Sequence, residues 1–63
     1  MDRYTVTNDR YANDSEEYTA ADLRMLMEHH AAMAGEDVPN LVFRDGLVYV
    51  EGEERPLAER APA

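Results

Sequence analysis

Imidazole and hydroxyl groups are the first candidates for chemistry in this 63-residue chain, which contains no Cys. His29 and His30 are its two histidines, and neighbouring side chains on a helix diverge by about 100°, so their rings cannot act on one atom. Ser15 is the single serine and lies in the most polar stretch of the chain. Catalysis needs reactive groups that converge in a partly dry cleft. We therefore predict no catalytic residue and no enzyme activity.

A second candidate is the methionine stripe, which we define as Met25, His29 and Met33 at four-residue spacing. Thioether and imidazole donors suit Cu(I), but one strong ligand with two weak ones does not make a metal site. Residues 9–17 are rich in carboxylates, yet they lack the central Gly and the spacing of an EF-hand loop. We expect no metal and no cofactor. Because Met packs adaptably against irregular surfaces, we interpret the stripe as a contact surface.

Charge limits the classes of partner. The chain has 14 acidic and 6 basic residues, a net charge of −8, and its basic residues are scattered arginines. Nucleic-acid binding needs clustered basic side chains and anionic membranes repel an acidic protein, so we expect neither partner. An acidic surface instead favours encounter with a basic protein. A requirement for solubility, or adaptation to high salt, would also explain the excess of acidic residues, and these alternatives stay open.

Six carboxylates are candidates for contact with a basic partner, around the start and the end of an expected helix: Asp14, Glu16, Glu17, Asp22, Glu36 and Asp37. Carboxylates spaced along one face can imitate the phosphates of DNA. The size and charge of the chain are those expected of an inhibitor or adaptor that occupies the nucleic-acid groove of a larger protein. A phage-encoded inhibitor of host machinery is one example of such a protein. The alternative function is a structural homodimer or a small subunit of a larger assembly, without ligand chemistry.

One helix is expected from about Ala20 to about Ala34. Thr19 and Asp22 form a Thr-x-x-Asp variant of the capping box, which predicts the start. Gly35 is typical of the residue after a helix end. The side chains between them form an apolar stripe at spacings of three and four: Leu23, Leu26, Met27, His30, Ala31 and Ala34.

A β-hairpin is expected from Leu41 to Val50, because Asp45-Gly46 is a strong two-residue turn signal. One face of this hairpin suits packing on the helix and carries Leu41, Phe43, Val48 and Val50. The opposite face carries Val42, Leu47 and Tyr49 beside Arg44, and we call it the open face. An uncovered sheet face should be polar. We therefore predict that the open face is covered by the C-terminal tail through Leu57, by a second copy or by another protein.

The two ends of the chain are less regular. Residues 3–7 alternate as in a strand, and Asn8-Asp9 can turn the chain so that residues 10–12 return as a second strand with Tyr11 opposite Val6. Charge and proline predict an extended or disordered tail over residues 53–63.

The expected fold is α+β: a single small domain over residues 1–52, with a strand or N-terminal hairpin, one amphipathic helix and a β-hairpin. The strands are expected to form an antiparallel sheet packed on the helix. Because no signal peptide and no apolar run of about 20 residues is seen, we expect a cytoplasmic protein.

Overall fold

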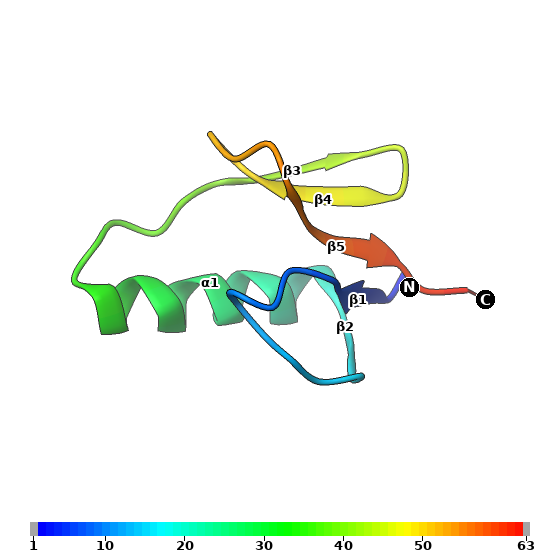
Figure 1. Ribbon diagram of the computed structural model, residues 1–63, viewed down its shortest axis with the longest axis horizontal. Coiled ribbons are helices and arrows are strands. Elements are labelled where there is room, and N and C mark those ends of the chain that lie inside the picture. The colour runs from blue at the N-terminus through cyan, green and yellow to red at the C-terminus, as the bar shows by residue number, and fades with distance from the viewer. Residues whose placement is uncertain (1, 63) are drawn as a thin grey trace.

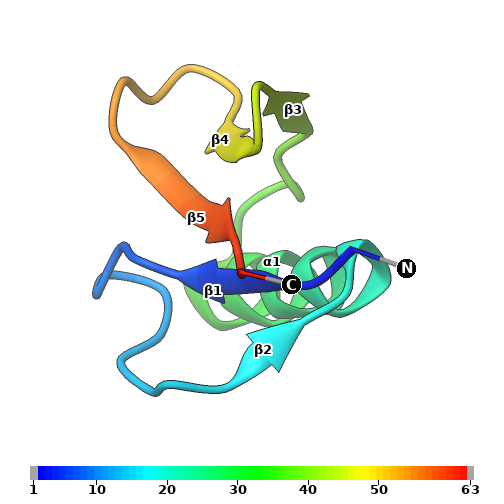
Figure 2. The same cartoon turned by 90° about the vertical axis from the view of Figure 1, so that its right-hand side faces the viewer.

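The computed structural model describes residues 2–62 and shows a small α+β fold, one helix against a five-stranded antiparallel sheet (Figure 1). The prediction of this fold class is confirmed. The elements in chain order are β1 (Tyr4–Val6), β2 (Glu17–Tyr18), α1 (Ala20–Ala34), β3 (Leu41–Arg44), β4 (Leu47–Val50) and β5 (Pro56–Arg60). The strands lie in the order β2-β1-β5-β4-β3 and curve around one side of α1 (Figure 2).

The helix has the predicted bounds because both of its ends are capped locally. The Thr19 hydroxyl oxygen accepts the Asp22 N–H at 3.1 Å, and the Asp22 carboxylate accepts the Thr19 N–H at 3.2 Å. At the other end Gly35 adopts a left-handed φ of 69°, and the Glu36 N–H donates to the Ala31 carbonyl at 2.9 Å. These bonds satisfy backbone groups that a helix end otherwise leaves free.

The β3–β4 hairpin also has its predicted register. Phe43 pairs with Val48, and Val42 pairs with Tyr49. Both turn residues have positive φ, 53° at Asp45 and 77° at Gly46. This is the geometry of a type I′ turn, whose twist matches that of the two strands.

Residues 53–62 differ from the tail that was expected over 53–63, because Pro56–Arg60 forms β5, the central strand of the sheet, and residue 63 lies outside the described residues. β5 pairs with β1 on one side and with β4 on the other. Leu57 and Ala58 are fully buried. Pro56 is tolerated because it occupies the first position of the strand. The charged neighbours that suggested a tail lie at the exposed ends of this strand.

The expected N-terminal hairpin is wrong, because residues 9–11 form a turn, residue 12 belongs to no strand, and the second neighbour of β1 is Glu17–Tyr18. Asn8 is buried and accepts the Arg10 N–H with its side-chain oxygen at 3.1 Å. The N–H groups of Thr7 and Asn8 both donate to the Leu57 carbonyl, at 3.0 and 3.2 Å. These bonds hold the chain against β5 and direct residues 10–12 out of the sheet.

The core lies between α1 and the concave face of the sheet. Its buried side chains are Val6, Leu23, Met27, Val48, Val50, Leu57 and Ala58. Each buried side chain of the size of Leu or Val contributes about 1.5–3 kcal/mol of transfer free energy. The core therefore depends on β5 as much as on the helix.

Candidate functional site

The open face lies where the sequence predicted it, on the side of the hairpin that is turned away from α1. Val48 and Val50 are buried in the core, so their neighbours along β4, Leu47 and Tyr49, point outward and are half-buried. Val42 on β3 is 39% exposed. Leu57 packs into the core on the other side of the sheet, so the tail does not cover this face through Leu57.

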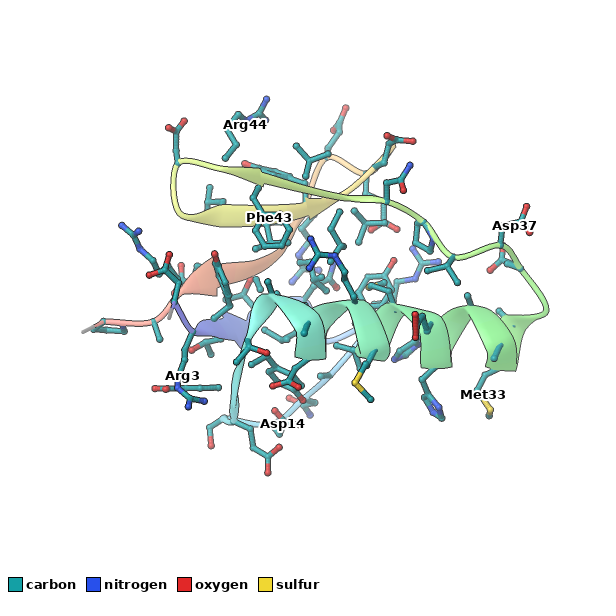
Figure 3. The ribbon with its side chains drawn as sticks, turned by 180° about the vertical axis from the view of Figure 1, so that it is seen from behind. Arg3, Asp14, Met33, Asp37, Phe43 and Arg44 are labelled. Carbon is teal, nitrogen blue, oxygen red and sulfur yellow. The ribbon has the colours of Figure 1, made fainter. Side chains whose placement is uncertain are left out.

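Arg44 covers part of Tyr49. Its guanidinium carbon lies 5.1 Å from the centre of the Tyr49 ring, and the side chain extends from the outer side of the hairpin (Figure 3). A cation over an aromatic face is a favourable contact. Phe43, the neighbour of Arg44, lies on the helix side of the same strand (Figure 3).

The open face ends in a hollow of about 420 Å³, which we call the outer hollow. Its apolar floor includes Val42 and Tyr49. Its rim is the acidic turn, residues 51–54, in which Glu51 and Glu54 are exposed. The apolar floor can thus contact an apolar side chain of a partner, and the neighbouring carboxylates can bind a basic side chain. Val42 and Tyr49 of the floor were candidates from the sequence, whereas none of residues 51–54 of the rim was, and residues 53 and 54 were expected to belong to a tail.

A second hollow, of about 350 Å³, lies on the other side of the acidic turn, and we call it the inner hollow. The end of α1 reaches beyond the strands, and the segment after it returns toward β3 (Figure 1). The inner hollow lies between these parts and is open to solvent. It is lined by Arg10, Tyr11, Met27, His30, Ala31, Ala34, Glu36, Asp37, Pro39, Val50, Glu51 and Glu53. Only Glu36 and Asp37 of this set were candidates from the sequence.

Tyr11 joins three parts of the inner hollow. Its hydroxyl donates to Glu53 Oε2 at 2.5 Å, and Arg10 Nη1 lies 3.3 Å from the same oxygen. His30 Nε2 is 2.7 Å from the Tyr11 carbonyl oxygen, and a carbonyl can only accept, so this nitrogen carries hydrogen. Burial, and then the hydrogen bond to Glu53, raise the pKa of Tyr11 above its ordinary value. The hydroxyl is therefore held in its protonated form as a donor.

The six candidate carboxylates form two groups rather than one. Asp14, Glu16, Glu17 and Asp22 surround β2 and the start of α1, whereas Glu36 and Asp37 follow its end. A helix of 15 residues separates the groups by about 22 Å, and Asp14 and Asp37 lie at opposite ends of it (Figure 3). The structure therefore does not bring all six together.

Two carboxylates of the first group have structural roles. Asp22 caps α1, as described above. Asp14 accepts the Tyr18 hydroxyl at 3.0 Å and the Glu16 N–H at 3.2 Å. The hydrogen bond that Tyr18 donates to Asp14, and then burial, raise the pKa of Tyr18 above its ordinary value. Glu16 and Glu17 remain exposed and accessible to a partner.

The methionine stripe lies on a third side of the molecule. Met25 is 65% and Met33 78% exposed, and His29 is exposed between them. Met33 points away from the sheet (Figure 3). Within residues 2–62, no three His, Asp or Glu side chains are grouped as ligands for a metal ion.

Comparison of the chain with protein-family models, with curated proteins and with solved structures gives no match. The part of the chain that the structure describes contains no helix long and apolar enough to cross a membrane. Function is therefore inferred from the geometry and charge of these surfaces.

Proposed function

We propose that this chain is a small acidic protein-binding module without catalytic activity, an inhibitor or adaptor of a basic partner protein. The outer hollow is the observation that carries this proposal, because Val42 and Tyr49 adjoin Glu51 and Glu54 there. A partner segment would place an apolar side chain on the floor and a basic side chain at the rim. Buried aromatic anchors supply most of the affinity of such contacts, and rim charges accelerate encounter.

The partner class that fits is a nucleic-acid-binding protein with a basic groove. The net charge of −8 supports long-range attraction to such a groove. The exposed carboxylates at both ends of α1 add to this attraction, although they lie apart from the outer hollow. We place the interaction in the cytoplasm, the host cytoplasm if the chain is phage-encoded.

Affinity measurements test this proposal. The full chain is titrated against purified nucleic-acid-binding proteins with basic grooves, and DNA is then added as a competitor. We expect binding that DNA displaces. The double variant V42T/Y49T should bind at least about tenfold more weakly, because it removes the apolar floor while keeping residues that favour strands.

The methionine stripe, the other candidate contact surface, shares no residue with the outer hollow, and we propose that this partner does not contact it. The matched control is therefore M25Q/M33Q, which makes a similar apolar-to-polar change on the stripe. This variant should bind as the unmodified chain does, and circular dichroism should show that both variants remain folded. Equal affinity of V42T/Y49T and the unmodified chain would contradict the proposal, as would binding that DNA does not displace.

A homodimer is the second candidate function, and the free edge of β3 favours it. The Glu51 N–H donates to the Asn40 carbonyl at 2.9 Å, so Asn40 and Glu51 are a hydrogen-bonded pair. Hydrogen-bonded and non-hydrogen-bonded pairs alternate along β3 and β4 from this point. In this register the backbone groups of Leu41 and Phe43 point away from β4. A second β3 would pair there and extend the sheet. Light scattering tests this alternative: a dimer mass supports it, and a monomer mass at all concentrations rejects it.

A further inference from the structure

The inner hollow has the shape of a site for one long side chain. Its volume of about 350 Å³ lies at the lower end of the range for ligand pockets. Ala31 and Ala34 leave space along α1, and Pro39 supplies apolar surface from the segment after the helix. These residues suit the methylene groups of a chain and do not offer it hydrogen bonds.

The rim of the inner hollow has the opposite character. Four carboxylates border it, those of Glu36, Asp37, Glu51 and Glu53, against the single guanidinium of Arg10. Among residues 2–62, the ion pairs are Arg10 with Glu53 and Arg60 with Asp2. Three of the four rim carboxylates are thus unpaired in the described structure. A cationic group that enters the hollow would meet an excess of negative charge.

Arg10 shows how the rim accommodates a guanidinium. Its Nη1 approaches Glu53, and its guanidinium carbon lies 5.4 Å from the centre of the Tyr11 ring. The Tyr11 and His30 rings stand 5.3 Å apart in an edge arrangement. Planar stacking beside a carboxylate is the mode of binding that distinguishes Arg from Lys. The Arg10 side chain is 69% exposed, so it occupies the rim and leaves the floor free.

We infer that the inner hollow binds an arginine side chain of the partner, with the methylene groups against Ala34 and Pro39 and the guanidinium at Glu36, Asp37 and Glu51. This inference rests on the proposed function and specifies one contact of the partner. Glu51 and Glu53 border both hollows. A partner that fills the two hollows would straddle the acidic turn, with an apolar anchor on one side and an arginine on the other.

A titration followed by NMR tests the inference directly. The ¹⁵N-labelled full chain is mixed with the peptide acetyl-Gly-Arg-Gly-amide, and in parallel with the same peptide carrying citrulline, which has the shape of arginine without its charge. We expect saturable changes at the backbone amides of residues 34–37 and 51–53 with the arginine peptide. The citrulline peptide should give no saturable change.

Two variants separate the floor from the rim. A34L fills the hollow without a change of charge, and E36Q/D37N removes two rim charges; each should weaken peptide binding about tenfold. The control E16Q/E17Q removes two exposed charges at the other end of α1 and should change the affinity less than about twofold. Circular dichroism verifies that all three variants are folded.

Several results would overturn the inference: changes located elsewhere, equal changes with citrulline, or unchanged binding by A34L. These results differ from failure of the proposed function. If a basic protein binds the unmodified chain and the A34L variant with equal affinity, the proposed function is supported and the arginine site is rejected. If the arginine peptide binds in the inner hollow but no basic protein binds the chain, the arginine site is supported and the proposed function is rejected.

Discussion

At the scale of single residues, Tyr11 links the N-terminal segment to the rest of the molecule. Its hydroxyl donates to Glu53, its carbonyl accepts from His30, and its ring faces the inner hollow. The expectation that Tyr11 lies in a strand opposite Val6 failed because the buried Asn8 turns the chain first. The contacts of Tyr11 join residues 42 positions apart, and no local pattern in the sequence indicates them.

Tyr11 gives a prediction for alkaline pH. Its folded-state pKa is raised above the value of about 10 for an unfolded tyrosine. The folded protein therefore keeps a proton that the unfolded chain loses, and this contribution to stability is present below pH about 10 and is lost as pH rises through the folded pKa. Y11F should show a smaller fall in the free energy of unfolding between about pH 8 and pH 11.

Urea unfolding at a series of pH values measures this difference. The raised pKa of Tyr18 contributes equally to the unmodified chain and to Y11F, so the difference between the two curves reports on Tyr11. Parallel curves for Y11F and the unmodified chain would show that the Tyr11 proton does not stabilise the fold.

At the scale of elements, local signals predicted α1 and the β3–β4 hairpin, whereas β2 and β5 were missed. Thr19, Gly35 and Asp45-Gly46 act within a few residues of the structures that they determine. β5 is paired with β1, nearly the full length of the chain away, in the register Val6 with Ala58. Its segment has Leu57 as its one large aliphatic side chain and shows no apolar alternation. Only the tertiary pairing makes it a strand.

Leu57 therefore provides a test of the role of β5. L57A removes a fully buried side chain and should lower the free energy of unfolding by about 2–5 kcal/mol. A core of this size supplies about 3–5 kcal/mol in total, so this variant should be largely unfolded. R55A, an exposed change two residues earlier, should shift stability by no more than about 0.5 kcal/mol. Chemical denaturation that gives both variants the same midpoint would contradict the central position of β5.

At the scale of the whole molecule, the candidate surfaces lie on different sides. The open face adjoins the acidic turn, the methionine stripe lies on the far side of α1, and Glu16 and Glu17 lie near β2. Alternation along two strands was enough to predict the orientation of Val42, Leu47 and Tyr49. The inner hollow was not predictable, because it forms only when three separate stretches of the chain meet, residues 10–11, 27–39 and 50–53.

This arrangement predicts separate effects of charge and apolar contact on binding kinetics. Raising NaCl from about 50 to about 500 mM should slow association with a basic partner, because screening weakens long-range attraction. V42T/Y49T should instead accelerate dissociation, because it removes contacts made only in the complex. Surface plasmon resonance measures both rates. An association rate that does not depend on salt would show that the net charge of −8 does not guide the encounter.

The location of the bound partner tests the central claim most directly. The ¹⁵N-labelled chain is titrated with a basic nucleic-acid-binding protein that it binds, and changes in amide signals are assigned to residues. We predict the largest changes at Val42, Leu47 and Tyr49 and at residues 51–54. Changes confined to Met25, His29 and Met33, with the open face unaffected, would contradict the account.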